Sequence, residues 1–545
     1  MENHRLVIAV VLSFGLLFGW QIFSQYMGWA PKPAPTTAQM PPADAPAPVP
    51  AAEDAQPLRI PAAPPSPGRD VVVETPLYTA VFNSAGGTLK DFALKKYQNS
   101  DPESSRPSGK ALHLLKAGEL PQGAIGLFIN NQSTWPDGQK DGPRWSYAGE
   151  SSINLREGEL SIHFDGLSDG LVIRRTFILK ADAYVLRELV RIGSESARSV
   201  NIVRSLSTGE LSGDKEYSNV TKVVLAQGGE FLDETDKKRL AAGMNYGERI
   251  QWAGAMSSYF LTAVIPQDQT LNLRAIHQNE NYTLLLEKKQ VSLEPGQDFS
   301  AEFSYYIGPK LKNDLEAAPA DLSPVMEYGW FGWIASPLLI MLRWFHALTG
   351  NWGTAIILLT VVIKIVLWPL SYRSYKSMEN MKKLQPIMTK IREKYKDDRQ
   401  RQNQEVMQLY KTYKVNPMGG CLPILVQLPV FFGLYRALLS SIELRHAGFI
   451  EFLPFTDIVW LADLSAKDPL YITPIVMGIS MLLQQKMTPT TGDPTQAKIM
   501  MLMPIVFTFM FITFPSGLVI YWLFNNIISI AQQHGQMKLS SRKQS

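Results

Sequence analysis

The stretch Trp352–Leu370 constrains the fold most, because it is apolar at almost every position and long enough to cross a lipid bilayer. Its nineteen residues would form a helix of roughly 28 Å, about the thickness of one hydrocarbon core. The stretch nevertheless contains Lys364. A lysine near the bilayer midplane costs about 2.5–3.5 kcal/mol on insertion scales. Three explanations are therefore open: the side chain snorkels to the membrane surface, it has a buried partner, or it lines a wet cavity.

Further apolar segments predict a polytopic α-helical membrane protein with six spans. The first lies in residues 1–27 and is interpreted as an uncleaved anchor, because its apolar run is long for a signal peptide, which is the alternative. Residues 371–417 carry twelve Lys and Arg against five Asp and Glu, which is typical of a cytoplasmic loop. Six spans then place this loop and both termini in the cytoplasm. The last four spans, within residues 417–534, are Cys421–Ser441, Tyr471–Gln485, Lys498–Phe514 and Leu518–Gln533.

The region between the first two spans is typical of soluble protein. Residues 28–68 are crowded with Pro and Ala, which predicts an extended tether. Residues 69–318 alternate apolar and polar positions between turn signals, as in Phe299–Ile307, and predict a large β-sandwich outside the cytoplasm. The seven histidines of the chain have no metal-ligand spacing, and neither GxxxxGK[ST] nor GxSxG occurs. We therefore expect no catalytic residues, no metal, no cofactor and no direct nucleotide binding.

Two amphipathic regions flank the span predicted at residues 351–372. Residues 319–350 contain three tryptophans around Pro337, which favours a helix lying in the membrane interface; a true span at residues 328–346 is the alternative. Residues 373–416 combine helical spacing of apolar side chains with many basic ones, and predict a cytoplasmic helical hairpin. A hairpin that packs only on itself and has no partner is also open. The residues expected to matter in it are Met381, Lys382, Lys383, Leu384, Ile387, Ile391 and Tyr410, and a basic tail follows at residues 535–545.

Polar side chains recur inside the predicted spans. Thr360 and Lys364 lie four residues apart and so share one helix face. No Asp or Glu occurs in the later spans to neutralise Lys364, which favours a wet cavity open to the cytosol over a buried pair. Snorkelling remains the alternative for the lysine, and simple ties between helices are the alternative for the Gln and Asn side chains. Methionines crowd the same spans and indicate either core filling or an adaptable surface.

The sequences NPMGGCLPILVQLPVF at Asn416–Phe431 and FPSGLVIY at Phe514–Tyr521 closely resemble the membrane insertases of the YidC/Oxa/Alb family. The resemblance runs along the whole chain and includes Leu384–Ile387 and QKMTPTTGDP at Gln485–Pro494. It implies the Gram-negative type with a large periplasmic domain, in which five spans form a hydrophilic groove open to the cytosol and to lipid. Such a protein inserts, folds and helps to assemble integral inner-membrane proteins, alone or with the Sec translocon.

The resemblance also implies roles for individual residues. The one basic residue of the groove falls on Lys364, where many Gram-negative members have arginine, and the groove's aromatic residue falls on Trp522, beside Tyr521. The implied groove comprises Lys364, Thr360, Gln427, Tyr521, Trp522, Asn525 and Asn526, and the implied slide for the substrate helix comprises Met477, Met481, Met501, Phe431, Phe432 and Phe507.

The partners that the resemblance implies are nascent membrane proteins, the lipid bilayer, the Sec translocon (SecYEG, SecD and SecF) and the ribosome, which would meet the hairpin and the tail. Two alternative functions stay open on the residues alone. One is an anion-selective transporter or channel, with Lys364 as the anion site. The other is a membrane-anchored envelope sugar-binding protein, because the predicted β-sandwich permits it.

Overall fold

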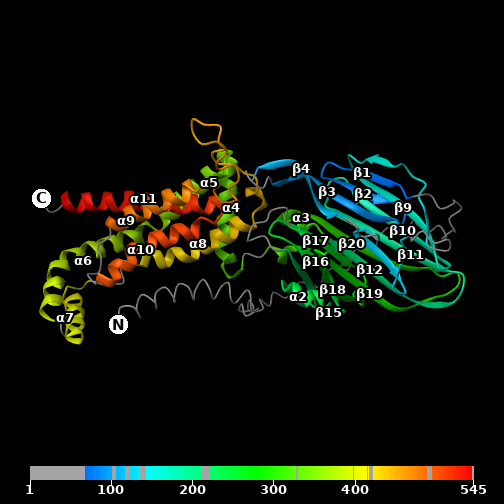
Figure 1. Cartoon of the computed structure of the whole chain (residues 1–545), viewed down its shortest axis with the longest axis horizontal. Coiled ribbons are helices and arrows are strands. Elements are labelled where there is room, and N and C mark those ends of the chain that lie inside the picture. The colour runs from blue at the N-terminus through cyan, green and yellow to red at the C-terminus, as the bar shows by residue number, and fades with distance from the viewer. Residues whose placement is uncertain are drawn as a thin grey trace. The chain divides into compact units, whose positions relative to one another are not determined.

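The structure is a computed structural model that describes residues 68–100, 106–116, 123–135, 143–211, 221–326, 329–396, 398–413, 415, 422–487 and 494–542. The anchor and nearly all of the tether expected before residue 68 lie outside the described residues, as does the end of the tail. The chain forms two compact units (Figure 1). Among the described residues, the β-rich unit ends at residue 326 and the helical unit begins at residue 329.

Burial along the strands explains why the β-rich unit forms sheets. In β2 (Tyr78–Asn83) every second residue is buried, as expected for a strand with one face on the core. In β17 (Phe260–Pro266) every residue is buried, because this strand lies between β16 (Ile250–Met256) and β20 (Phe299–Pro309) and both of its faces are covered. The period-two pattern in the sequence therefore marks the partly exposed strands, and a continuous apolar run marks a central one.

Three sheets are present among the described residues. The nine-stranded sheet is antiparallel and has the order β14-β13-β16-β17-β20-β11-β10-β9-β7. Its other strands are β14 (Glu230–Glu234), β13 (Lys222–Gln227), β11 (Val185–Ser194), β10 (Leu171–Lys180), β9 (Glu159–Ser168) and β7 (Arg144–Ser146).

The two remaining sheets are smaller. The six-stranded sheet contains, in order, β15 (Met244–Gly247), β18 (Asn272–Gln278), β19 (Asn281–Leu293), β12 (Arg198–Thr208), β5 (Ile125–Ile129) and β6 (Gln132–Ser133). The five-stranded sheet contains β4 (Pro107–Lys116), β3 (Thr88–Ser100), β2, β1 (Asp70–Glu74) and β8 (Ser152–Asn154), with β1 and β8 parallel. Two short helices, α2 (Lys237–Ala241) and α3 (Lys312–Glu316), complete the unit.

A buried ionic network joins these sheets. Glu188 on β11 accepts hydrogen bonds from Arg175 on β10 at 2.8 Å, from Tyr305 on β20 at 2.9 Å, and from Arg204 on β12. Arg175 also donates to the carbonyl of Gly86, in the turn between β2 and β3, at 2.8 Å. Because these partners come from all three sheets, the network fixes how the sheets pack. The sequence pattern did not predict this network, since charged residues in strands are usually exposed.

The helical unit contains eight α-helices in its described part. A shared apolar core is formed by residues of α4, α5, α8, α9, α10 and α11, and α6 and α7 form a separate small core. The helices are α4 (Gly332–Thr349), α5 (Trp352–Val366), α6 (Trp368–Lys394), α7 (Arg399–Thr412), α8 (Leu422–Ser440), α9 (Ile472–Met487), α10 (Pro494–Phe511) and α11 (Ser516–Arg542).

The span predicted at residues 351–372 is not one straight helix. Asn351 caps the start of α5 by accepting a hydrogen bond from the backbone N–H of Thr354 at 2.9 Å, but α5 ends at Val366 and α6 starts at Trp368 after a bend of 64°. Pro369, in the first turn of α6, has no N–H to continue the α5 hydrogen-bond ladder. Lys364 therefore lies in the last turn of α5, close to the bend.

No single described helix is both long and apolar enough to be a candidate span, and the bent pair of α5 and α6 is a candidate when its two parts are taken together. Two shorter apolar helical stretches, Val426–Ser440 and Met500–Phe511, lie in α8 and α10.

The hairpin and the tryptophan-rich helix form as helices. Within the hairpin, Met381 and Leu384 of α6 pack with Tyr410 of α7, while Lys382 and Lys383 are exposed. Ile387 was expected in this core but is exposed, and Ile391 is only partly buried. The buried stripe continues through Met388, which lies seven residues after Met381 and so on the same helix face.

α4 shows the two-sided burial of an amphipathic helix. Leu338 and Leu342 are buried, and the helix packs against α5 and α8. Trp333 and Trp344 are exposed on its other side. Exposed tryptophans on one face are typical of helices at a membrane interface.

Candidate functional site

Lys364 is buried where α5 meets α11. Its ammonium group donates a hydrogen bond to Ser529 Oγ at 2.7 Å, and Ser529 Oγ in turn donates to the carbonyl of Asn525 at 2.7 Å. No carboxylate among the described residues lies within ion-pair distance of Lys364. An ammonium group has three N–H donors, so a single hydroxyl partner leaves most of its hydrogen-bonding capacity unused. The wet cavity expected around Lys364 stays a prediction.

A second polar contact joins α8 to α11. Gln427 Nε2 donates to Tyr521 Oη at 2.8 Å and to Asn525 Oδ1 at 2.5 Å. Because Asn525 also accepts from Ser529 through its carbonyl, hydrogen bonds run without a break from Lys364 to Tyr521. This chain of contacts, which we call the polar relay, consists of Lys364, Ser529, Asn525, Gln427 and Tyr521 and involves α5, α8 and α11.

Three residues expected in the groove are not part of the polar relay. The hydroxyl of Thr360 donates to the carbonyl of Ile356 in its own helix at 2.7 Å. Asn526 donates to Ser480 Oγ on α9 at 3.0 Å, so the adjacent residues 525 and 526 connect α11 to different helices. Trp522 packs its ring against aromatic residues of α8 and α10, and its indole N–H is buried without a hydrogen-bond partner.

Polar side chains continue along α11 towards its C-terminal end. Gln533 Nε2 donates to the carbonyl of Met487 at 3.0 Å, and Gln536 Nε2 donates to the carbonyl of Tyr372 at 3.2 Å. The Oε1 atoms of Gln532, Gln533 and Gln536 are buried and have no hydrogen-bond partner. Buried acceptors without partners favour bound water. Gln532 and Gln533 follow Ser529 by three and four residues, and Gln536 follows these two at the same spacing. This repeat was the signal in the sequence for the extended polar face.

The residues expected to guide the substrate's apolar helix differ in exposure. Met501 is 65% exposed, while Met481, Phe432 and Phe507 are partly buried. Met477 and Phe431 lie in the core of the helical unit, at 0% and 5% exposure, so the prediction that they line an outer face was wrong. Apolar spacing alone cannot tell the core side of a membrane helix from its lipid side. The exposed apolar face of α9 and α10 comprises Ile475, Ile479, Leu483, Met501, Leu502, Ile505, Val506 and Phe509.

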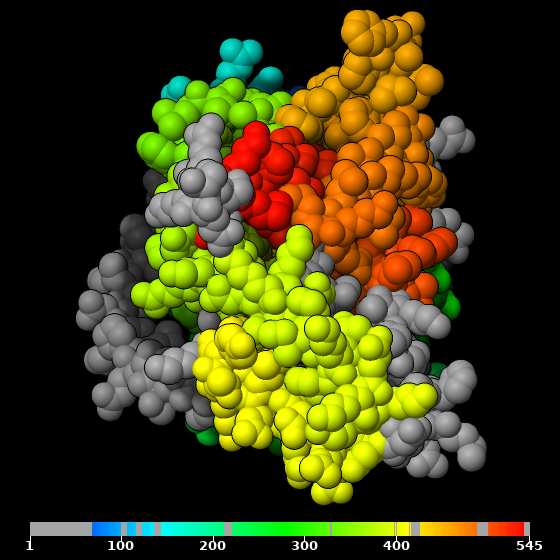
Figure 2. Space-filling model, turned by 90° about the vertical axis from the view of Figure 1, so that its left-hand side faces the viewer, coloured from blue at the N-terminus to red at the C-terminus, as the bar shows by residue number. Residues whose placement is uncertain are grey.

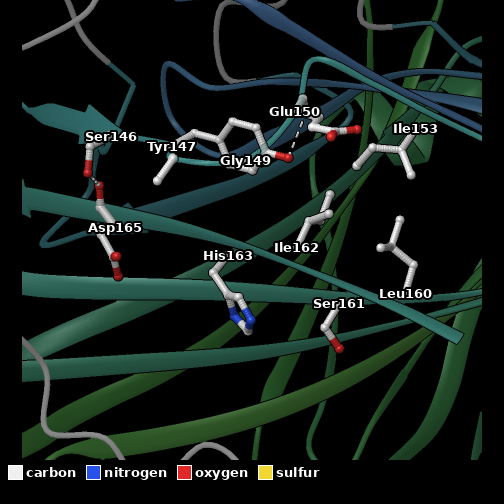
Figure 3. Close-up of a pocket in the computed structure, with 11 residues that line it drawn as sticks. Ser146, Tyr147, Gly149, Glu150, Ile153, Leu160, Ser161, Ile162, His163 and Asp165 are labelled. Atoms are coloured by element: carbon white, nitrogen blue, oxygen red, sulfur yellow. Dashed lines mark hydrogen bonds between the residues drawn. The ribbon is translucent and has the colours of Figure 1, made fainter.

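The β-rich unit contains a pocket of about 420 Å³ between the β7–β8 connection and β9 (Figure 3). Three of the polar residues that line it, Tyr147, His163 and Asp165, have partners within the unit. Tyr147 Oη donates to the carbonyl of Glu150 at 2.9 Å, His163 shares a hydrogen bond with Thr176 at 2.9 Å, and Asp165 pairs with Arg174 at 2.7 Å. No group of three or more potential metal ligands occurs among the described residues.

Comparison with known proteins covers both units. Residues 70–341 match the family model of the YidC periplasmic domain, and residues 344–543 match that of the 60Kd inner membrane protein. The chain is 48% identical to the membrane protein insertase YidC of Nitratidesulfovibrio vulgaris (strain DP4) over 98% of this chain and 99% of that one. It is 47% identical to the insertase of Oleidesulfovibrio alaskensis over 99% of this chain and 100% of that one.

A solved structure is also similar. A crystal structure of an active YidC insertase with its first transmembrane domain resolved matches 85% of this chain and 92% of its own, at 20% identity and a TM-score of 0.37.

Proposed function

Because the chain belongs to the family of YidC membrane protein insertases with a periplasmic domain, and is therefore a non-enzymatic insertase of the inner membrane, we propose that the polar relay around Lys364 is the part that receives the substrate. The full-length relatives are insertases, which removes the reason to consider a channel or a sugar-binding protein. The single observation that carries the proposal is Lys364 itself, a buried cation with one hydroxyl partner.

In this proposal the relay acts as a polar receptor for a segment that must cross the membrane. A nascent protein's extracytoplasmic segment, often acidic, has to leave water, and desolvation opposes its passage. A buried ammonium group with unused donors, next to Asn and Gln side chains, replaces part of the lost hydration and attracts negative charge. The substrate's apolar helix then leaves along the exposed face of α9 and α10 into lipid. Hydrophobic partition and the membrane potential drive the step without a nucleotide.

The topology and the partners belong to the same proposal. Six spans would put both termini and the α6–α7 hairpin in the cytoplasm and the β-rich unit in the periplasm. The exposed Lys382 and Lys383 support ribosome binding at the hairpin, and the Sec translocon is the proposed partner in the membrane. Replacing both lysines by Glu should weaken co-sedimentation with ribosomes while ribosome-free insertion is kept. Unchanged co-sedimentation would count against the hairpin as a ribosome site.

Reconstituted insertion tests the role of Lys364. Protein in liposomes is given a single-span substrate with an acidic translocated tail, and the protease-protected fraction is measured. Lys364→Ala should lower the insertion rate at least about tenfold, which corresponds to about 1.4 kcal/mol of lost stabilisation, and Lys364→Arg should retain it. Lys486→Ala is the matched control, because Lys486 is an exposed lysine in the last turn of α9. Normal insertion by Lys364→Ala with every substrate would show that the buried charge has no part in insertion.

A further inference from the structure

A short β-hairpin projects from the loop between α8 and α9. Backbone hydrogen bonds join Phe449 to Leu461 at 2.8 Å and Leu453 to Ile458 at 2.9 Å, and Phe452 and Val459 form a bridge. The segment around residue 450, coloured gold, stands out from the helical unit in both Figure 1 and Figure 2. We refer to residues 449–461 as the tip hairpin.

The end of the tip hairpin has an unusual turn. Thr456 N donates to the carbonyl of Leu453 at 3.0 Å, with Pro454 second and Phe455 third in the turn. Phe455 has φ +68°, a conformation that this turn position normally gives to Gly or Asn. A bulky side chain there is strained. The strained position presents the phenyl ring wholly to the outside, at 107% relative exposure. Three more exposed apolar side chains surround it: Ile450, Phe452 and Ile458.

The base of the tip hairpin is fixed to the ends of membrane helices. The carbonyl of Phe449 accepts from Asn351, the N-cap of α5, at 3.2 Å, and its ring lies so close to Gly353 that a Cβ there would be 2.2 Å from it. Trp460 Nε1 donates to Asp468 at 3.1 Å, and Asp468 accepts from the N–H of Thr473 in the first turn of α9 at 2.7 Å. The apolar tip is therefore continuous with the end of the bundle where α5 and α9 begin and α8 finishes.

We propose that the tip hairpin inserts Phe455 and its apolar neighbours into the interfacial layer of the bilayer, as a fixed wedge at the end of the bundle. The inference rests on the proposed membrane placement of α5, α8 and α9. Continuity with these helices brings the tip to the boundary between hydrocarbon and water, where aromatic side chains are favoured. The thirteen residues of the tip hairpin are fewer than the 20–30 per partner that a stable protein interface typically uses, so lipid is the better occupant.

The chemistry of the tip also defines which lipids suit it. Residues 446–466 contain no Lys or Arg, and Glu451 and Asp457 flank the apolar side chains. Attraction to anionic headgroups therefore has no source in this segment, and the contact should depend on apolar burial alone. The acidic flanks keep the insertion shallow, at the depth of headgroups and first methylenes.

Depth-dependent quenching tests the wedge in the full-length protein. Cys421, the one native cysteine, is replaced by Ser, and Phe455→Cys carries an environment-sensitive dye in phosphatidylcholine liposomes. We expect blue-shifted emission, quenching by lipids with a nitroxide near the headgroup, and iodide quenching at least about threefold weaker than in detergent-free unfolded protein. Replacing a third of the lipid by phosphatidylglycerol should leave these values unchanged.

A second variant separates lipid contact from folding. Phe455→Gly suits the positive φ and should keep the turn, so a dye at Ile458→Cys reports on depth with and without the phenyl ring. The dye should move towards water when the ring is absent. Water-like emission and full iodide access at residue 455 would overturn the proposal. Blue-shifted emission without quenching by nitroxide lipids would overturn it too, since that result means burial against protein. Insertion activity of Lys364 variants is not involved, so failure here is distinct from failure of the polar relay.

Discussion

The buried charges of the two units differ in how many hydrogen-bond partners they have. In the β-rich unit, Arg175, Glu188 and Arg204 are fully buried, and each makes several hydrogen bonds to the others or to backbone carbonyls. Although burial alone would raise the pKa of Glu188, the two guanidinium groups hold it below its ordinary value. In the helical unit, Lys364 is also buried but has one hydroxyl partner.

This difference separates a structural role from a functional one. A buried ion whose hydrogen-bonding groups are all paired has no capacity left for another molecule, so the arginines and Glu188 hold the sheets together. An ion with unused donors carries a cost in stability that only a transient partner or water can offset. Burial alone would place both ions in one class, and the number of hydrogen-bond partners distinguishes them.

The largest effect should follow from breaking the complete network. Glu188→Gln leaves Arg175 and Arg204 buried without an anion, and should lower the free energy of unfolding of the β-rich unit by about 3–5 kcal/mol. Denaturant unfolding or protease resistance of the full-length protein measures it. Asp70→Asn is the control, because Asp70 pairs with Lys90 at the surface and its loss should cost less than about 1 kcal/mol. Equal losses in the two variants would contradict the structural role of the network.

Removing the charge of Lys364 should change the free energy of unfolding in the opposite direction. Lys364→Met removes a buried charge and keeps an apolar chain of similar length, so the helical unit should gain about 1–2 kcal/mol in stability while insertion is lost. Unfolding in mixed detergent micelles reports the first effect and proteoliposome insertion the second. Lys486→Met, at an exposed position, should change neither by much. A strong destabilisation by Lys364→Met would make the lysine a structural residue and remove the contrast with Glu188.

Asp463, in the loop between α8 and α9, is an intermediate case. Its carboxylate accepts from the N–H and hydroxyl of Ser465 at 2.8 and 2.7 Å, yet burial raises its pKa to about 6. The folded state therefore holds a proton that the unfolded state has lost above about pH 4, and stability should fall by about 1 kcal/mol from pH 5 to pH 7. The free energy of unfolding, measured from pH 5 to pH 7, should lose this pH dependence in Asp463→Asn and keep it in Asp457→Asn. A pH dependence that survives in Asp463→Asn must have another source.

The sequence predicted the parts of this contrast that depend on local pattern. Apolar runs marked helices of the helical unit, and the later predicted spans contain no Asp or Glu. The bend after Val366 was also predictable, since Pro369 restricts the residue before it and ends the helix ladder. The buried position of Arg175 was not predictable, because its partners come from strands distant in the sequence. Only the register of β10 decides that Arg175 points inwards while Arg174 points outwards.

The rotation of each membrane helix about its own axis was equally beyond the sequence. Tyr521 and Trp522 are neighbours with similar polarity, and either could have faced Gln427. Packing decides it: Trp522 fills an aromatic cluster with Phe431, which leaves the hydroxyl of Tyr521 beside the amide. Core and lipid faces are both apolar in such helices, so Met477 and Met501 could be told apart only by their exposure.

The smallest expected effect tests the far end of the polar relay. Tyr521→Phe removes the hydroxyl that accepts from Gln427 but keeps the ring, and Gln427 retains its bond to Asn525. The loss in stability should be about 0.5–1 kcal/mol, the net value of one hydrogen bond. A double-mutant cycle with Gln427→Leu should give a coupling of the same size. Since four hydrogen bonds separate Lys364 from the Tyr521 hydroxyl, insertion of a substrate without polar residues should be unchanged, and insertion of one with an acidic tail should slow by a few-fold. If both substrates slowed equally, the hydroxyl would position α8 against α11 and have no part in receiving polar segments.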